Sequence, residues 1–151
     1  MALFSVPLIP AQAAEMQDYI KYRKELMRLM HKHHDAITKA LRNDYPADDL
    51  IVHARALHRI SGSFGDLFPE GSGKSVKGAY WTKAKPAIWT ERAAFDAYLL
   101  GLQGYTSSLV EAAEKQDREE AESVRRNMRI LCKSCHHEFK NAKKEIVYEN
   151  E

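Results

Sequence analysis

A short motif near the end of the chain groups the residues best suited to chemistry. It reads Cys132-Lys133-Ser134-Cys135-His136, and it contains both cysteines of the 151-residue chain. Two cysteines three positions apart lie on nearly the same face of a helix, and the histidine projects from that side too. Both thiols can therefore form thioethers to one porphyrin while a histidine ring nitrogen reaches the iron. The spacing predicts attachment of a c-type haem through Cys132 and Cys135, with His136 as an axial ligand.

The sequence alone leaves two other uses of the cysteine pair as alternatives. A structural zinc site usually takes four protein ligands, so the missing ones would have to come from His31, His33 and His34. A redox dithiol is expected at a helix N-terminus that follows a strand. This pair instead lies deep inside a helical pattern that begins near Asp117. Haem attachment is therefore the favoured prediction.

Length and composition indicate one domain with a sizeable core. The chain has 151 residues and a formal net charge of +2, with no block of like charge. That balance argues against nucleic-acid binding. No apolar run approaches the roughly 20 residues of a membrane span, so none is expected.

The start of the chain resembles the end of a secretory signal. Residues 2–9 are apolar and uncharged, and an A-x-A tripeptide ends at Ala13, so cleavage is expected after that residue. A positively charged beginning is missing. We therefore interpret residues 1–13 as a truncated signal segment and residues 14–151 as the haem domain, with a disordered apolar tail as the alternative. Export to the periplasm suits the motif, because c-type haem is generally attached outside the cytoplasm.

Four stretches show helical periodicity, and none shows a strand pattern. The first covers residues 15–43, the second runs from Pro46 to about Phe68, the third follows Thr90 as N-cap, and the fourth begins with an approximate capping box at Asp117 and Glu120. Short first and third connections predict an all-α fold, an antiparallel up-down-up-down four-helix bundle. The positions expected to face its core are Met16, Ile20, Arg23, Met27, Met30, His34, Ile37, Leu41, Leu50, Ala54, Leu57, Ser61, Phe64, Phe95, Leu99, Leu102, Thr106, Leu109, Ala113, Ala121, Val124, Met128, Leu131 and Cys135.

A long segment, residues 69–89, joins the second and third helices. It is rich in glycine, lysine and aromatic residues. A connection of this length inside a compact domain is uncommon and usually functional. We expect Trp81 or Tyr80 to fold over an edge of the porphyrin, with plain core packing of these aromatics as the alternative.

The first and last helices of such a bundle are neighbours that run in opposite directions. Met27 lies about 18 Å from the start of the first helix, and His136 lies about 14 Å from the end of the last, at roughly 1.5 Å per residue. The two side chains should therefore lie at similar heights. We expect Met27 on the opposite side of the iron from His136, as a sixth ligand or as a cover over an open position; a plain core methionine is the remaining alternative.

Arg23 lies one turn before Met27 on the same buried seam. A buried guanidinium is costly unless it meets an anion. A haem propionate is the expected partner, and a side chain that snorkels to solvent is the alternative.

Other histidines and two glycines carry weaker expectations. We expect His34 to be a core or edge histidine rather than a ligand, and we expect His53 and His58 to be solvated because they fall off the seam. Gly101 and Gly104 share one helix face at a cost of about 1 kcal/mol each relative to alanine. Close approach of another backbone, in this chain or in a homodimer partner, would offset that cost.

Together these residues resemble class II cytochromes c, the cytochrome c′ family, including its low-spin members. The resemblance rests on the C-x-x-C-H motif near the C-terminus, on residues 22–27 in the first helix, and on segments 68–72 and 85–89, which bracket the loop. It spans nearly all of residues 14–151. It implies a periplasmic four-helix bundle with one covalent haem, often a homodimer.

The resemblance also implies a role for each matching residue. The thioether, proximal-ligand and propionate positions fall on Cys132, Cys135, His136 and Arg23. Lys140 matches a basic position near the proximal histidine. Lys24 is a further haem-binding candidate, although it stands where glutamine is expected beside the arginine. Met27 takes the distal position, which in the family is either a ligand or a non-ligating cover.

Two functions suit one haem in a rigid bundle. Electron transfer with redox partner proteins is the favoured prediction, with His136 and Met27 facing the iron, because it requires no further pocket features. The alternative is binding of nitric oxide or carbon monoxide at a five-coordinate iron. An enzyme is not expected, because no residue near Met27 is identifiable as a distal acid or base.

Overall fold

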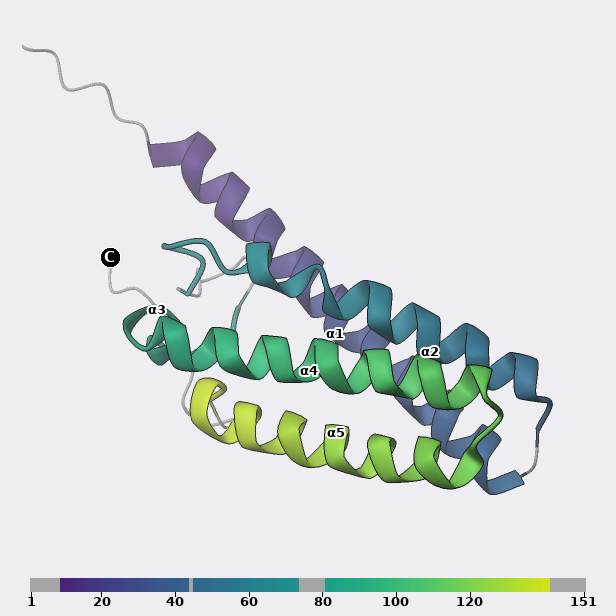
Figure 1. The fold of residues 1–151 in the computed structure, drawn as a ribbon. Coiled ribbons are helices and arrows are strands. Elements are labelled where there is room, and N and C mark those ends of the chain that lie inside the picture. Colours follow the sequence, from purple (N-terminus) through teal and green to yellow (C-terminus); the bar gives the residue numbers. More distant parts are fainter. Residues whose placement is uncertain (1–8, 44, 74–80, 142–151) are drawn as a thin grey trace, which may run out of the picture.

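The computed structural model describes residues 9–43, 45–73 and 81–141. Four long helices run antiparallel in chain order (Figure 1): α1 (Ile9–Asn43), α2 (Ala47–Ser61), α4 (Arg92–Glu114) and α5 (Arg118–Phe139). Two short turns, η1 (Phe64–Leu67) and α3 (Ala87–Thr90), lie in the connection between α2 and α4. The predicted all-α, antiparallel four-helix bundle with a long second connection is confirmed.

The second helix is shorter than expected. It was predicted to reach about Phe68, but α2 ends at Ser61. The N–H of Gly62 bonds to the His58 carbonyl at 3.3 Å, and the N–H of Ser63 closes a tighter turn that leads into η1. The prediction was wrong because the apolar spacing continues through a 3₁₀ turn, which periodicity alone does not distinguish from an α-helix.

Prolines precede two of the helices. Pro46 is the N-cap of α2, one position before its expected place in the first turn. Pro86 precedes α3, and its carbonyl accepts the N–H of Thr90 at 3.2 Å. Thr90 was expected to cap the third long helix, but it ends α3, and Glu91 is the N-cap of α4. The fixed φ of proline starts a helical turn early and shifts the boundary.

The beginning of α1 lies at Ile9, earlier than the expected start at residue 15. Residues 1–8 lie outside the described part of the chain, and residues 9–13 belong to the helix. The signal segment at residues 1–13 therefore stays a prediction. Among the described residues, no helix combines the length and apolar character needed to cross a bilayer.

The core follows the expected seams in α2, α4 and the first half of α5, where every expected position is buried. In α1 the buried face is displaced at two positions. Leu26 and Ala40 are buried, whereas Met27 is 37% exposed and Leu41 lies at the margin. Ile20, Arg23, Met30 and Ile37 stay buried as expected, so the displacement concerns these two positions and not the whole helix face.

The contacts between helices are uneven. The pairs α1–α2, α2–α4 and α4–α5 pack along their lengths, whereas α1 and α5 meet sparsely. They are close where α5 begins, because the Arg118 guanidinium donates to the carbonyls of Ala40 (2.7 Å) and Leu41 (3.1 Å). Toward the end of α5 the two helices diverge (Figure 1). We call this divergent stretch the α1–α5 seam.

The two glycines of α4 have different surroundings. A Cβ at Gly101 would lie 3.4 Å from both terminal methyl groups of Leu131 on α5, whereas no described atom comes within 4 Å of the corresponding point at Gly104. The expected approach of another backbone within the chain is therefore wrong. Gly101 admits a side chain, and Gly104 faces open space.

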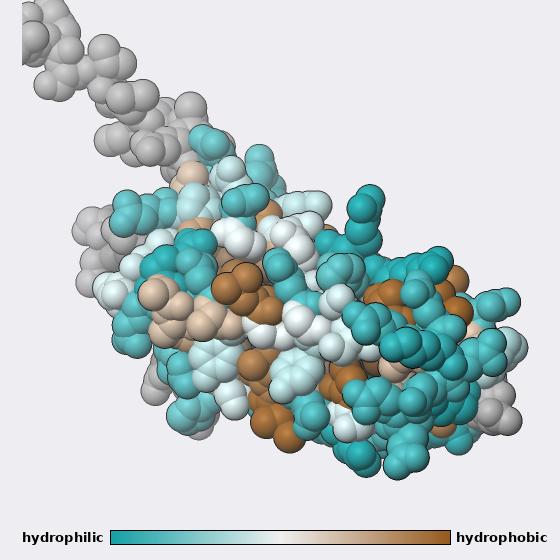
Figure 2. Space-filling view, viewed as in Figure 1, coloured by the Kyte–Doolittle hydropathy of each residue, from teal (hydrophilic) through white to brown (hydrophobic). Residues whose placement is uncertain are grey.

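The outer surface is predominantly hydrophilic. Figure 2 shows apolar side chains in separate patches on the visible face, between charged and polar ones. Such scattered apolar residues are usual for a folded protein surface.

Candidate functional site

The end of α5 carries the cysteine and histidine motif. The helix begins at Asp117, whose side chain accepts a hydrogen bond from the Glu120 N–H at 3.0 Å. From there it continues unbroken to Phe139. Cys132 and Cys135 therefore lie one turn apart on the same face. Both thiols are free, half-buried and packed against the hydrophobic core. They are available for covalent attachment at the margin of the core.

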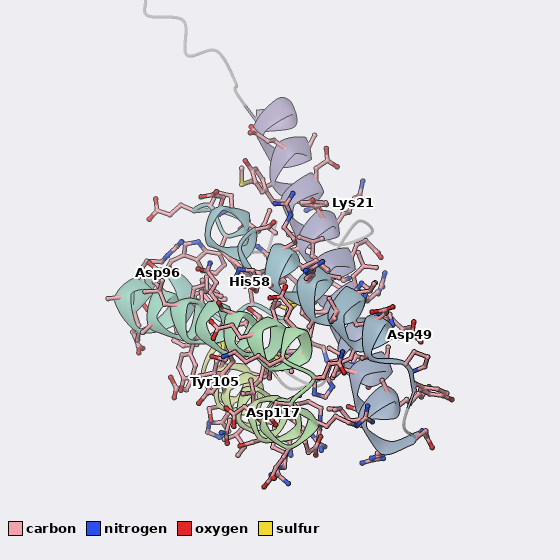
Figure 3. All side chains as sticks on the ribbon, turned by 45° about the vertical axis from the view of Figure 1, so that its right-hand side comes forward. Lys21, Asp49, His58, Asp96, Tyr105 and Asp117 are labelled. Atoms are coloured by element: carbon pink, nitrogen blue, oxygen red, sulfur yellow. The ribbon has the colours of Figure 1, made fainter. Side chains whose placement is uncertain are left out.

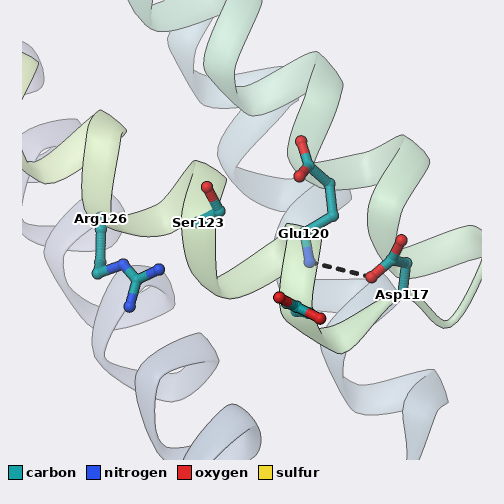
Figure 4. Close-up of a pocket in the computed structure, with 5 residues that line it drawn as sticks. Asp117, Glu120, Ser123 and Arg126 are labelled. Atoms are coloured by element: carbon teal, nitrogen blue, oxygen red, sulfur yellow. Dashed lines mark hydrogen bonds between the residues drawn. The ribbon is translucent and has the colours of Figure 1, made fainter.

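A hollow in the surface lies at the start of α5, away from this motif. Figure 4 shows its lining, which consists of Asp117, Glu119, Glu120, Ser123 and Arg126. Asp117 is occupied as the N-cap, and negative side chains there are stabilised by the positive end of the helix dipole. Ser123 lies about 14 Å along the helix from Cys132. This hollow is a solvated helix start and not part of the candidate site.

The pKa values of the two thiols are shifted in the opposite direction to those of a redox dithiol. Burial raises the pKa of Cys132, and burial together with the neighbouring Cys132 and Glu138 raises the pKa of Cys135 to about 11. Catalytic dithiols have a lowered thiol pKa and often lie at a helix N-terminus. This pair lies near the C-terminal end of α5. The redox-dithiol alternative is contradicted.

The described residues do not support a zinc site built on the cysteines. Within the described ranges, no group of three or more His, Cys, Asp or Glu side chains could hold a metal ion. Two of the three histidines that would have to complete it have other partners. His31 lies 3.4 Å from the carboxylate of Asp35, and His33 lies against His53 with 3.0 Å between their Nδ1 atoms.

The remaining histidines agree only in part with expectation. His34 is an edge histidine as predicted, and its Nε2 is buried without a hydrogen-bond partner among the described residues. His58 is exposed as predicted, and its Nδ1 lies 3.2 Å from the Thr106 hydroxyl between α2 and α4 (Figure 3). His53 was expected to be solvated, but it is half-buried against His33. Sequence spacing within one helix does not show a partner on the next.

His136 follows the cysteines and opens onto a hollow of about 510 Å³. The residue is exposed, yet burial of its ring together with the nearby Lys140 ammonium lowers its pKa. The ring is therefore neutral at neutral pH, which is the form that binds metal ions. The other residues that line this hollow are Lys83, Lys85, Lys133, His137, Lys140 and Asn141. Sequence reasoning missed the first three lysines, because two of them come from the loop and only folding brings them beside α5.

Arg23 is buried in α1 with an exposed fraction of 4%. Its guanidinium donates to the Ser72 hydroxyl and carbonyl at 2.8 and 2.5 Å and to the Thr82 hydroxyl at 2.8 Å. It also donates to the Leu67 carbonyl at 3.3 Å and lies 4.7 Å from the centre of the Phe68 ring. Burial lowers the pKa of Arg23 to about 10, so the side chain stays charged at neutral pH. The snorkelling alternative is wrong; the propionate contact stays a prediction.

The segment from Trp81 to Pro86 closes the α1–α5 seam at one end. On the α1 side, the Lys24 ammonium donates to the Trp81 carbonyl at 3.3 Å and lies 4.2 Å from the centre of the indole ring. On the α5 side, Ala84 pairs with Lys140 in an antiparallel bridge, and the Lys85 N–H donates to the carbonyl of the residue before Lys140. The segment therefore ties the two diverging helices together.

The aromatic residues of the loop were expected at a porphyrin edge or in the core. Trp81 is 41% exposed, so the core alternative is wrong for this residue. Its place at the end of the α1–α5 seam suits the first expectation, which stays a prediction. Tyr80 lies outside the described residues.

Met27 faces the margin of the core on α1. The bonds from Arg118 to the carbonyls of Ala40 and Leu41 fix the register between α1 and α5. Thirteen residues from these points, Met27 on α1 and Leu131 on α5 lie at about the same height, about 20 Å from the paired ends. His136 lies about 7 Å further along. Met27 is thus close in height to the cysteine and histidine motif, as the sequence predicts.

The chemistry of the residues around the α1–α5 seam fits a covalent haem. Two free thiols one turn apart lie at the core margin, and a neutral imidazole follows them on α5. A buried cation, Arg23, and a thioether, Met27, come from α1 opposite. Sparse contact between these helices leaves this face of each helix without a continuous partner. Sequence reasoning did not identify Ser72 and Thr82, which hold Arg23; Ser72 is in the segment 68–72 that supports the resemblance, and Thr82 carries no such signal.

Comparison with known proteins gives consistent matches over most of the chain. The sequence model of the family described as cytochrome C′ matches residues 18–140. A cytochrome c′ of Rhodospirillum rubrum is 32% identical over 131 residues, which cover 86% of each chain. A solved cytochrome c′ with an unusual ligand-controlled dimer dissociation has a TM-score of 0.79 at 22% identity, covering 84% of this chain and 97% of that one. A nitric oxide complex of a variant cytochrome c prime from Alcaligenes xylosoxidans has a TM-score of 0.76 at 23% identity, with coverage of 85% and 97%.

Proposed function

Because the chain belongs to the cytochrome c′ family of non-enzymatic haem proteins, we propose that it holds one covalent haem c in the α1–α5 seam and binds a small gas there. Two observations support the proposal. The half-buried thiols and the histidine end a helix that contacts α1 only sparsely, and α1 carries Arg23 and Met27 at a similar height. When bound, the group supplies an iron atom that can take up a small gas or pass an electron.

Each residue of the seam has a defined part in this proposal. Cys132 and Cys135 carry the thioethers, and His136 offers a neutral ring nitrogen from the proximal side. Arg23 and Lys24 are the cations of α1 that reach a propionate. Lys140, whose backbone is fixed by the bridge to Ala84, places positive charge beside the histidine, which adds to the effect of burial in lowering the pKa of His136. Trp81 covers the edge between the helices.

We prefer gas binding because the Met27 side chain is partly exposed. Its side chain is 37% exposed and lies outside the packed core, so it keeps several rotamers and can move aside for a small ligand. The nitric oxide complex of the Alcaligenes xylosoxidans relative supports the same choice. Met27 then acts as a non-ligating cover over an open position.

Electron transfer is the second candidate, and the chemistry of Met27 favours it. A thioether is an axial ligand in other c-type cytochromes. With Met27 and His136 both binding the iron, the protein would be a six-coordinate electron carrier. The cationic surface around His136, which includes Lys83 and Lys133, would then face an acidic redox partner.

Export is part of the proposal. The A-x-A tripeptide that ends at Ala13 supports cleavage there and a periplasmic location. Cleavage after Ala13 leaves the rest of α1, including Arg23 and Met27, in place. Formation of a homodimer stays a prediction.

The coordination state is tested by absorption spectra of both oxidation states, with and without carbon monoxide. We expect a high-spin ferrous spectrum that converts promptly when carbon monoxide is added. We also expect a Met27→Leu variant, which keeps the volume but removes the sulfur, to have the same ferric spectrum. A methionine-to-iron charge-transfer band that disappears in Met27→Leu would instead establish the electron carrier.

Covalent attachment is tested separately by the mass of the intact chain. Protein matured in a host competent for cytochrome assembly should carry the added mass of one haem. Replacing both cysteines by alanine should remove that mass, whereas Met27→Leu should retain it. A bare polypeptide mass for the unaltered chain would overturn the haem assignment as a whole.

A further inference from the structure

Two histidines meet between α1 and α2, on a different side of α1 from the α1–α5 seam. His33 of α1 and His53 of α2 have 3.0 Å between their Nδ1 atoms, and their ring centres lie 5.2 Å apart with a tilt of 51°. Both residues are half-buried and therefore reachable by small solutes. The next residue, His34, lies about 100° further round the helix, and Arg125 of α5 influences its charge.

The pair has the separation of two ligands on one metal ion. Imidazole nitrogens bound to zinc at about 2.0–2.1 Å lie about 2.9 Å apart when they meet at a right angle and about 3.4 Å apart at the tetrahedral angle. The observed 3.0 Å lies within this interval. Only a rotation of the two partly exposed rings is needed for both lone pairs to converge on an ion.

The charge state of His33 suits metal binding as well. Burial and the neighbouring His53 both lower the pKa of His33, so its ring is neutral at neutral pH. A neutral imidazole offers a lone pair without first releasing a proton. An acidic residue, Asp49, precedes His53 by one turn near the start of α2 (Figure 3), which adds negative charge on that side of the helix.

We propose that His33 and His53 form a binding site for a divalent late transition-metal ion, with zinc as the probe ion, that bridges α1 and α2. The two rings supply two ligands, and water completes the coordination. Imidazole suits zinc, copper and nickel, whereas calcium and magnesium prefer oxygen ligands. A site with two protein ligands is open and exchangeable, unlike a structural site with four. This inference is independent of the gas-binding proposal.

The experiment titrates the ferric holoprotein with Zn²⁺ by calorimetry and compares single substitutions. We expect one ion to bind per chain. Because loss of an outer-sphere partner already weakens metal binding 10–100-fold, loss of a direct ligand in His33→Gln or His53→Gln should weaken it at least about tenfold. The matched control is His31→Gln, which removes an exposed histidine of the same helix that pairs with Asp35. This variant should bind Zn²⁺ as the unaltered protein does.

A melting experiment gives a second reading that does not depend on calorimetric heat. Zn²⁺ at about 100 times its Kd should raise Tm by roughly 5–10 °C, because an ion that binds only the folded chain stabilises it. The shift should vanish in both ligand variants, each compared with its own metal-free Tm, so that any change in intrinsic stability cancels. Equal Zn²⁺ affinity in all four proteins, or no binding at millimolar Zn²⁺, would overturn the proposal and leave His33 and His53 as an interhelical hydrogen bond.

Discussion

At the scale of single residues, Arg23 shows how a charge can be buried without a carboxylate partner. Its neighbours in the described structure are hydroxyl and carbonyl oxygens of Leu67, Ser72 and Thr82. A fork of guanidinium donors can serve several such acceptors at once, which an ammonium cannot. Arg23 therefore fixes two parts of the loop against α1, and its contact with a propionate stays a proposal.

Replacing Arg23 should lower the stability of the folded protein. We expect Arg23→Met, which keeps the apolar stem, to lower the free energy of unfolding by about 2–4 kcal/mol, because it removes several charge-assisted bonds and leaves buried acceptors unpaired. Lys24→Met is the matched control on the next residue. Its contact with the Trp81 carbonyl is exposed, so the loss should stay below about 1 kcal/mol. Urea unfolding of the two holoprotein variants measures both changes; equal losses would contradict the structural role of Arg23.

The sequence predicts some of these residues better than others. Cys132, Cys135 and His136 are recognisable because their roles depend on local spacing alone, which a helix translates directly into one face. That Arg23 is buried follows from periodicity as well. Its partners Ser72 and Thr82 do not, because they lie 49 and 59 positions away and only the fold of the loop brings them to α1.

At the scale of helices, α4 carries two glycines with different surroundings. Gly104 has open space where a Cβ would point, whereas the same point at Gly101 lies 3.4 Å from the methyl groups of Leu131. Both glycines lower helix stability relative to alanine. Their shared spacing in the sequence predicts a common role, but the structure assigns a packing reason to Gly101 alone.

This difference predicts unequal gains in stability when each glycine is replaced by alanine. We expect Gly104→Ala to raise the free energy of unfolding by about 0.5–1 kcal/mol, since it gains helix propensity without a clash. Gly101→Ala should gain less, because Leu131 must shift by a few tenths of an ångström to accommodate the methyl group. Thermal unfolding of the two variants at matched protein concentrations measures both changes in stability. A destabilised Gly104→Ala variant would indicate that this face is covered, as in a homodimer.

Helix boundaries depend on physical effects that periodicity does not contain. In α1, Leu26 is buried in place of Met27, because burial depends on what the neighbouring helices supply and α5 contacts α1 sparsely. The third long helix begins after Glu91 rather than Thr90 because Pro86 starts a separate turn. The existence and the direction of the four helices can be predicted from the sequence. Their exact ends depend on the local turns, which periodicity does not describe.

At the scale of the whole molecule, three of the four neighbouring helix pairs pack closely without any bound group. Only α1 and α5 diverge, and the segment from Trp81 to Pro86 holds them together at the open end. The order of helices is predictable from sequence, because short connections force antiparallel neighbours. The distance between two neighbours is not, because it depends on the side chains and groups that fill the space between them.

This uneven packing predicts what the chain does when the proposed haem is removed. A Cys132→Ala, Cys135→Ala double variant should keep most of its helical circular dichroism, because α2 and α4 retain their partners. Its Tm should fall by roughly 10 °C, as for loss of a ligand held at about a thousand times its Kd. Hydrogen exchange should accelerate in residues 15–27 of α1 and in segment 81–86, which face the α1–α5 seam, while α2 and α4 keep their protection. Equal loss of protection in all four helices would show that the bundle depends on the haem throughout and not at one seam.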